Sequence, residues 1–219
     1  MPQKDNKASQ ESLYHIEIPY LVRRAKDLAA ELGFDLRPEG NRAGTNPTGP
    51  SCCINEVGVL LKTLSSSVRT GKIGEIGTGA GVGSAWIVSG MAAGVTFATA
   101  EVDSMLANSV AKLLAEYETV RVYDGDWRRE FMSNGPYNLI FADGGGVGNS
   151  KEEEWPLIAD LLVPGGIMVI DDLTPEELWP SDWIGKPDSK RELAFNSGFF
   201  QSTEVRSRPD VSTLIMVRN

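Results

Sequence analysis

The stretch from Lys72 to Asp103 constrains the fold of this chain more than any other part of the sequence. An apolar run, Ile73 to Ile76, leads into a dense run of glycines, and the segment from Ala85 to Met91 that follows is again apolar. A second apolar run, Val95 to Ala100, is followed at once by Glu101. This order predicts a strand, a tight turn, a helix and a second strand with an acid at its end.

The turn has glycine at four alternate positions, Gly77, Gly79, Gly81 and Gly83. Glycine adopts positive φ without strain and lets a ligand come close to the backbone. The turn leads into a helix N-terminus, where free N–H groups attract a carboxylate or a phosphate. The acid at the end of the next strand, Glu101, suits the paired hydroxyls of a ribose. The stretch therefore predicts a ligand with an anionic end and a ribose.

Two classes of cofactor fit such a ligand, and an ordinary glycine-rich turn is the alternative. A dinucleotide site needs G-x-G-x-x-G, but counting from Gly77 or Gly79 the sixth position is Val82 or Ser84. The pattern E-x-G-x-G-x-G is present from Glu75 to Gly81. It resembles the first motif of class I methyltransferases that use S-adenosylmethionine (SAM), so we expect a SAM site.

Length and composition suit one α/β domain, with 219 residues of which 41% are hydrophobic. The net charge of −9 makes nucleic acid a poor default partner, because a field of that sign repels polyphosphate. No apolar run approaches the roughly 20 residues that cross a bilayer. The polar residues 1–12 lack the apolar core of a signal peptide. These features predict a cytoplasmic protein without a membrane segment.

Apolar spacing and turn residues predict the remaining elements. We expect helices over 20–32, 54–68, 104–116 and 151–162, and a partly helical segment over 174–195. We expect strands over 120–123, 137–142 and 167–170, and a hairpin of strands 199–206 and 212–217. The predicted fold is a Rossmann-like α/β fold, with a seven-stranded, mainly parallel sheet, an antiparallel C-terminal hairpin and helices on both faces.

Three smaller features of the N-terminal third leave alternatives open. The loop over 37–50 is rich in Gly, Pro and Asn and is either a lid or a linker. His15 has no nucleophile motif near it and is interpreted as a surface residue. Cys52 and Cys53 are too few for a structural zinc site and, as sequence neighbours, poorly placed to pair, so we interpret them as reduced, buried thiols.

Acids follow two of the later strands, at Asp143 and at the pair Asp171 and Asp172. The carboxyl ends of parallel strands meet at one edge of an open sheet, so we expect these three acids to converge. Three carboxylates in one place can hold Mg²⁺ or Ca²⁺. The alternative is that an acid such as Asp172 caps the next helix.

From about residue 55 onward the chain resembles the caffeoyl-CoA and catechol O-methyltransferase type. The matching pieces are Asn55-Glu56-Val57-Gly58, EIGTGAG, TAEVD, YDGDW, NLIFAD, LLVPGGIMVIDD and the closing hairpin. The resemblance implies that Glu101 binds the SAM ribose, that Asp126 lies by the adenine with Trp127 beside it, and that the three late acids bind a metal. The cofactor-binding residues expected are Glu75, Gly77, Thr78, Gly79, Gly81, Ser84, Glu101, Val102, Asp126, Trp127 and Asp143; the catalytic and metal-binding residues expected are Asp143, Asp171 and Asp172.

The chain departs from that type at two places. Many members have a lysine shortly after the fourth-strand acid, but here the segment after Asp143 is glycine-rich and its first lysine is Lys151. The hydroxyl residue of the glycine turn is replaced by Gly83, with Ser84 one place later.

We therefore expect residues 1–53 to form an N-terminal tail, helix and lid-like loop, and residues 54–219 to form the SAM-dependent methyltransferase domain. The predicted reaction is in-line O-methylation of a small, phenolic type of acceptor, with Trp179 and Trp183 as candidate walls of its pocket. The resemblance implies a homodimer. The alternatives are a tRNA or protein methyltransferase, and a SAM-binding protein without catalysis.

Overall fold

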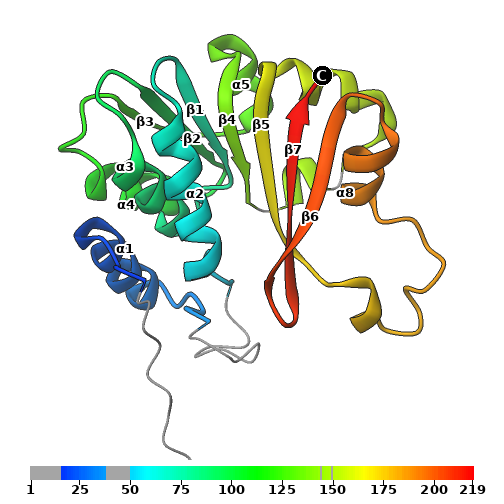
Figure 1. Cartoon of the computed structure of the whole chain (residues 1–219). Coiled ribbons are helices and arrows are strands. Elements are labelled where there is room, and N and C mark those ends of the chain that lie inside the picture. The colour runs from blue at the N-terminus through cyan, green and yellow to red at the C-terminus, as the bar shows by residue number, and fades with distance from the viewer. Residues whose placement is uncertain (1–15, 38–49, 144, 149) are drawn as a thin grey trace, which may run out of the picture.

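The computed structural model describes residues 16–37, 50–143, 145–148 and 150–219, which form a seven-stranded sheet with helices on both faces (Figure 1). The strand order is β3-β2-β1-β4-β5-β7-β6. The first five strands pair in parallel, while β7 pairs antiparallel with β5 and with β6. The strands are β1 Lys72–Ile76, β2 Thr96–Glu101, β3 Val120–Asp124, β4 Tyr137–Ala142, β5 Leu162–Leu173, β6 Phe200–Arg208 and β7 Val211–Arg218.

Two hydrophobic clusters place the helices on opposite faces of this sheet. The first cluster contains side chains of α1, α2, α3 and α4, and the second contains side chains of α5, α6 and α7 and of the turn η3 that follows α8. The helices are α1 Tyr20–Glu31, α2 Asn55–Ser67, α3 Val82–Gly90, α4 Ser104–Leu113, α5 Trp127–Asn134, α6 Gly145–Gly148, α7 Trp155–Asp160 and α8 Ser189–Arg191. Short turns lie at η1 Glu152–Glu154, η2 Glu176–Leu178 and η3 Glu192–Asn196. This architecture confirms the predicted fold class.

The largest differences from the sequence prediction lie after β3. The predicted helix over 151–162 is shorter, because Leu162 already pairs with Tyr137 as the start of β5. Helix α5 was not predicted, since only Trp127 and Phe131 of its eight residues are buried and its apolar stripe is one turn long. The glycine-rich segment after Asp143, for which no helix was predicted, forms α6 over its described part.

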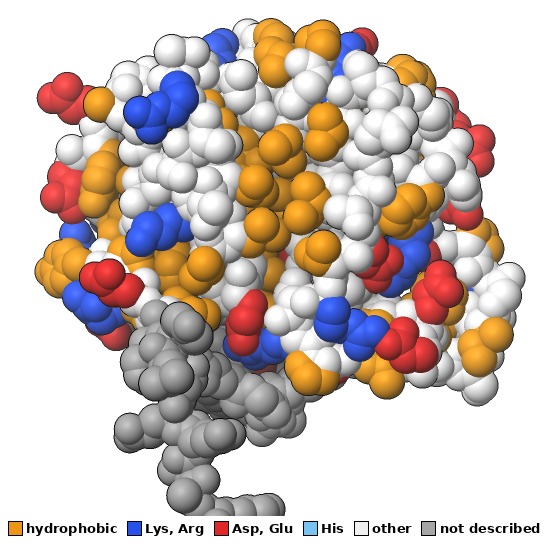
Figure 2. Space-filling model, viewed as in Figure 1, with side chains coloured by type: hydrophobic (Ala, Val, Ile, Leu, Met, Phe, Trp, Pro, Cys, Tyr) orange, Lys and Arg blue, Asp and Glu red, His pale blue; other side chains and the backbone are white. Residues whose placement is uncertain are grey.

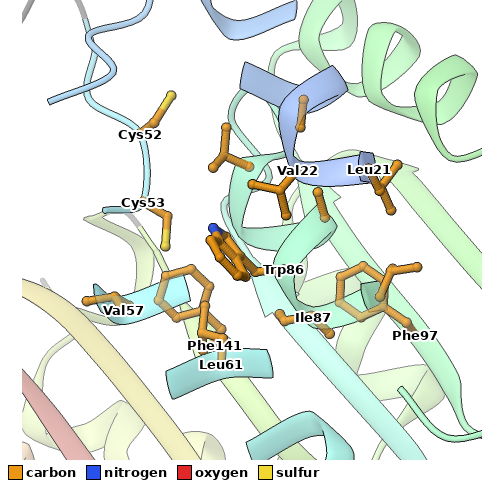
Figure 3. Packing of buried hydrophobic residues seen from close by; sticks show 14 of the residues in the cluster. Leu21, Val22, Cys52, Cys53, Val57, Leu61, Trp86, Ile87, Phe97 and Phe141 are labelled. Carbon is orange, nitrogen blue, oxygen red and sulfur yellow. The ribbon is translucent and has the colours of Figure 1, made fainter. Parts of the chain in front are cut away.

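The core beside β1 depends on close contact between α2 and α3. Trp86 is fully buried there, and Figure 3 shows its indole beside Cys53 and Phe141. A Cβ added at Gly58 would lie 2.2 Å from the Trp86 indole nitrogen, so the glycine makes room for this ring. Cys52 and Cys53 are free and buried, as the sequence predicts. Burial raises the pKa of the Cys52 thiol to about 12, so it is no thiolate nucleophile.

Gly90 of α3 lies directly against α2, and we expect Gly90→Ala to destabilise the protein. A Cβ at this position would lie 2.3 Å from the Lys62 carbonyl oxygen and 2.4 Å from the Ser65 Oγ. Relieving that clash costs about 1–3 kcal/mol, which outweighs the gain of about 1 kcal/mol in helix propensity. Each kcal/mol lowers Tm by about 2–4 °C in a chain of this size. Calorimetry is the measurement, and Ser89→Ala, one position earlier on α3, is the matched control; an unchanged Tm for Gly90→Ala would contradict this packing.

Candidate active site

The glycine turn after β1 has the backbone that the sequence predicts. Gly77, Gly79 and Gly81 have φ of 88°, 51° and 80°, in the left-handed region that favours glycine. The Gly77 amide donates to the Ala100 carbonyl at 3.0 Å, and the Gly79 amide donates to Glu101 Oε2 at 2.9 Å. The turn is therefore held against the carboxyl end of β2, and Gly81 N-caps α3.

A cavity of about 310 Å³ opens beside this turn, along the carboxyl ends of β1, β2 and β4. Six of the expected site residues line it, and five further residues complete the wall. The lining residues are Gly77, Glu101, Val102, Asp126, Trp127 and Asp143, with Ile76, Ala100, Gly125, Arg128 and Gly146. The volume is in the range of small-molecule sites, about 300–1,000 Å³.

Glu101 presents its carboxylate to both the turn and the cavity. Oε2 accepts from the Gly79 amide, and Oε1 accepts from the Asp103 amide at 3.0 Å. Each carboxylate oxygen accepts more than one hydrogen bond, so both oxygens retain capacity for a ligand's hydroxyl groups. The two amides orient the carboxylate before any ligand binds.

Asp126 and Trp127 form the far wall of the cavity. Asp126 caps α5, since its carboxylate accepts from the Arg128 amide at 2.8 Å. Trp127 is buried, and the Arg128 guanidinium lies 4.6 Å from its ring centroid. The cap fixes the start of α5 and so fixes where the indole lies against the cavity.

Three of the expected cofactor residues lie beneath the turn and not on the cavity. Thr78, Ser84 and Glu75 are all buried. Their side chains contact one another or the side chain of Thr99. Thr99 Oγ1 lies 2.6 Å from Thr78 Oγ1 and donates to Glu75 Oε2 at 2.7 Å, and Ser84 also donates to that oxygen. A Cβ at Gly83 would lie 2.5 Å from Glu75 Oε1, so glycine is required there. We infer that Glu75, Thr78 and Ser84 support the turn from below.

Burial raises the pKa of Glu75 to about 8, although the hydroxyls of Ser84 and Thr99 partly oppose the rise. The folded protein therefore keeps a proton that an unfolded chain releases above about pH 4.5, and stability falls as pH rises from there toward 8. We expect Tm to drop by several degrees between pH 5 and pH 8.5, and Glu75→Gln to show a shallower drop. Other buried acids also make Tm fall as pH rises. The test therefore compares the pH dependence of Tm in wild type and in Glu75→Gln, both measured by calorimetry. Equal slopes would show that Glu75 does not carry this proton.

The three late acids converge as the sequence predicts. One carboxylate oxygen each from Asp143, Asp171 and Asp172 lies within 4.8 Å of the others. Asp171 is 2% exposed, and its Oδ2 has no hydrogen-bond partner among the described residues. Burial raises the pKa of Asp143 to about 8 and that of Asp171 well above its usual range; neighbouring carboxylates add to both shifts. Asp143 also lines the cavity, so it belongs both to the cavity and to the cluster of three acids.

Two basic side chains lie against this cluster. The Arg37 guanidinium pairs with Asp172 Oδ1 at 2.8 Å, and the same nitrogen donates to the Cys52 carbonyl at 2.9 Å. Arg37 and Asp172 both have positive φ, 40° and 59°, a backbone that only surrounding contacts maintain in such residues. The Lys190 ammonium donates to the Asp171 carbonyl at 3.0 Å. Asp172 therefore pairs with Arg37 and does not cap η2, whose N-cap is Pro175.

The donor set of this cluster fits a divalent cation. Mg²⁺ and Ca²⁺ lie about 2.0–2.6 Å from their oxygen ligands, so ligand atoms up to about 5 Å apart can surround one ion. The unpartnered Asp171 Oδ2 is a buried carboxylate oxygen of the required kind. Asp172 is 33% exposed and engaged by Arg37, so a cation would share that carboxylate with the guanidinium or displace it.

Sequence reasoning missed Arg37 as a member of the site, and it named Lys190 only as part of a basic cluster with Lys186 and Arg191, without a contact to the acids. Arg37 belongs to a loop without periodicity, and Lys190 to a segment whose prolines hide its course. The predictions for His15 and for the loop over 37–50, apart from Arg37 and Pro50, concern residues outside those that the structure describes.

Comparison with known proteins agrees with this fold and site. Residues 75–173, from β1 to the end of β5, match a family model described as a methyltransferase domain. This part of the chain is thus similar to a methyltransferase domain, in agreement with the resemblance seen in the sequence. No curated protein matches the chain.

Solved structures with the same fold include three methyltransferases. The O-methyltransferase from Bacillus cereus, in complex with SAH, has a TM-score of 0.69 at 17% identity, with 93% of each chain covered. The O-methyltransferase TomG from Streptomyces achromogenes, in complex with SAM, has a TM-score of 0.69 at 19% identity, with 93% of this chain and 92% of TomG covered. A methyltransferase from Geobacter sulfurreducens has a TM-score of 0.63 at 13% identity, with 94% and 92% covered. Among the described residues, no helix is both long and apolar enough to cross a membrane.

Proposed function

We propose that this chain is a SAM-dependent O-methyltransferase acting on a small molecule. The observation that carries the proposal is the junction at Asp143, where a cavity bordered by the glycine turn and Glu101 meets a cluster of three acids. SAM, when bound, supplies a methyl group on a sulfonium. A cofactor site and a cluster that can activate a hydroxyl thus share one residue, as methyl transfer to oxygen requires.

The residues of the cavity have separate roles in this proposal. Glu101 accepts hydrogen bonds from the ribose hydroxyls, and the glycine turn lets the cofactor come close to the backbone. Asp126 and Trp127 border the adenine. Glu75, Thr78 and Ser84 hold the turn in place without touching the ligand. Together these residues bind and orient the cofactor and exclude water from it.

The acids prepare the acceptor. An acceptor hydroxyl is a poor nucleophile until its proton leaves, and either a base or a cation achieves this near neutral pH. Asp143, with a pKa raised to about 8 by burial, can take a proton directly. Alternatively, Asp143, Asp171 and Asp172 hold a divalent cation that lowers the hydroxyl pKa. We favour the cation, because the buried Asp171 Oδ2 has no other partner among the described residues.

Two measurements test the function. Thermal shift with SAM, SAH and NAD identifies the cofactor, and we expect stabilisation by the first two and none by NAD. Transfer of radiolabelled methyl from SAM to a panel of phenolic acceptors then tests catalysis. Stabilisation by SAM with no transfer to any acceptor would favour a SAM-binding protein without catalysis.

A tRNA substrate is less favoured by the surface near the site. The sequence places Lys186, Lys190 and Arg191 close together, as a basic cluster would require. Arg191 is buried, however, and pairs with Glu204 at 2.7 Å and Asp188 at 3.1 Å. Two lysines remain, which is few for phosphate-backbone binding by a chain of net charge −9.

We also propose a homodimer. Among the helices that the structure describes, none covers β5, β7 and β6 on the face seen in Figure 1. Figure 2 shows hydrophobic side chains gathered at the centre of this face. Val217 is 36% exposed on β7 and is paired in register with Ile167 on β5. Such a face is typical of a protein–protein contact. From the sequence, the helix over 20–32 is a second candidate for the interface, and this stays a prediction. The buried side of α1 packs on α3.

We expect sedimentation at micromolar concentration to give twice the mass of the chain. Val217→Glu places a charge on the exposed apolar face and is expected to give the monomer mass with an unchanged fold by circular dichroism. Lys112→Glu on α4, which adds the same side chain on another exposed surface, is the control. A wild-type monomer contradicts the dimer; a dimer in both variants would place the interface elsewhere.

We further propose a cytoplasmic location, supported by two free thiols, which suit a reducing compartment.

The division into residues 1–53 and the domain 54–219 is likewise kept as a proposal. The isolated bridge between Asp35 and Ser51 joins the two ends of the loop between them.

A further inference from the structure

A second pocket, of about 340 Å³, lies between the segment after β5 and the start of α8. It is the region where the chain from η2 to α8 loops away from the sheet in Figure 1. Its lining combines two indole rings with two ammonium groups. The lining residues are Trp179, Trp183, Lys186, Pro187, Asp188, Ser189 and Lys190.

Hydrogen bonds to the end of β5 attach this pocket to the acid cluster. The Trp179 indole donates to the Thr174 carbonyl at 2.9 Å, and the Arg191 guanidinium donates to the same oxygen at 3.0 Å. The Lys190 ammonium reaches the Asp171 carbonyl at 3.0 Å. Lys190 both lines the pocket and contacts Asp171. The pocket and the acid cluster are therefore separated by no more than about the length of this side chain.

The walls of the pocket suit a flat ring. Trp179 and Trp183 face each other edge to face, with ring centroids 6.5 Å apart. Trp183 is 46% exposed, although a tryptophan of a packed core would be buried. Indole rings in this arrangement offer both faces and edges to an aromatic ligand. The size of the pocket is at the lower end for small-molecule sites, about 300–1,000 Å³.

The charge of the pocket is opposite to that of the protein. Lys186 has no ion-pair or side-chain hydrogen-bond partner among the described residues, and Lys190 bonds to a carbonyl and not to a carboxylate. Asp188, the one acid of the lining, is engaged by the amides at the start of α8 and by Arg191. Two ammonium groups therefore face the pocket of a chain whose net charge is −9.

We propose that this pocket is the acceptor subsite and that it selects aromatic acceptors that carry an anionic group, a carboxylate or a phosphate. The ring lies against Trp179 and Trp183, the anionic group pairs with Lys186, and the hydroxyl points past Lys190 to the acids. The assignment rests on the proposed methyltransferase function and adds the class of its substrate. An acceptor of this kind places its negative group away from the three carboxylates, which would repel it.

Titration of tryptophan fluorescence tests the proposal with defined probes: 3,4-dihydroxybenzoate, its neutral counterpart catechol, and 3,4-dihydroxyphenyl compounds bearing a phosphate in place of the carboxylate. We expect both anionic probes to bind about tenfold more tightly than catechol, and this preference to weaken in high salt. Lys186→Gln is expected to abolish most of the preference, while Lys112→Gln, an exposed lysine on α4, leaves it unchanged. Trp183→Phe is expected to remove most of the signal change.

Three outcomes overturn the proposal: equal affinity for the charged and neutral probes, a preference that survives in Lys186→Gln, or a signal that does not involve Trp183. Preference for only one of the two anionic groups supports it and narrows the class. SAM affinity is measured by calorimetry in the same proteins. If SAM binds and the anionic preference is missing, the substrate class alone fails; if SAM does not bind, the proposed function fails and the acceptor assignment falls with it.

Discussion

Glu101→Ala is expected to weaken SAM binding at least about tenfold. The carboxylate lines the cavity and is already oriented by the amides of Gly79 and Asp103. Its two oxygens would accept from the ribose hydroxyls, and hydrogen bonds to a charged group contribute about 1.5–3 kcal/mol. One such bond corresponds to roughly a tenfold change in Kd, and two to more. Titration calorimetry with SAM measures the loss directly and needs no acceptor.

The controls separate the lost ligand contact from a disturbed turn. Glu101→Gln keeps an oxygen that can accept from the amides and should weaken SAM less than the alanine variant. Glu153→Ala removes the same charge from an exposed position on η1, outside the cavity, and should leave the affinity unchanged. Wild-type SAM affinity in a folded Glu101→Ala protein would exclude Glu101 from the cofactor site.

Asp171→Asn is expected to lower the affinity for Mn²⁺ or Mg²⁺ by roughly a hundredfold. Loss of a group that merely supports a ligand typically costs 10–100-fold in metal affinity, and Asp171 would be a direct ligand. Asp171 is 2% exposed and is the most buried of the three acids. Calorimetric titration with Mn²⁺ is the measurement. Asp182→Asn, an exposed acid of the same region, is the control for the loss of one charge.

The same substitution is expected to raise Tm when no cation is present. Burial and the neighbouring carboxylates disfavour the charged form of Asp171, so they raise its pKa. A neutral amide of the same shape removes that penalty. Weaker cation binding combined with higher stability would indicate a carboxylate kept for its ligand and not for the fold. Methyl transfer that persists in full after exhaustive chelation would end the cation proposal and leave Asp143 as the candidate base.

The local pattern of the chain was enough to predict the glycine turn, the strands and helix on either side of it, and the meeting of the acids. The turn follows from Gly77, Gly79 and Gly81, because positive φ is a property of single residues. The meeting of Asp143 with Asp171 follows from sheet geometry, since the carboxyl ends of parallel strands share one edge. Both inferences need only short-range rules applied to strands that periodicity had already located.

Side-chain direction around the turn required the folded structure. The motif grouped Glu75 and Ser84 with the ligand contacts, yet both lie beneath the turn with Thr99, while Glu101 reaches the cavity. A motif gives the order of residues along the backbone. Whether a given carboxylate points into the core or into the cavity depends on which neighbours pack against each face, and those neighbours come from other strands.

The basic residues of the site depended on the tertiary fold entirely. Arg37 reaches Asp172 across 135 positions of sequence, and Lys190 reaches Asp171 across 19. Neither residue lies in a strand or in a stripe of apolar spacing, so no periodic signal marks it. Such contacts form only where the packing of the fold brings the end of β5 close to Arg37 and to α8. The amino-acid order therefore determined the cofactor turn and the acids, whereas long-range packing alone placed their counter-charges.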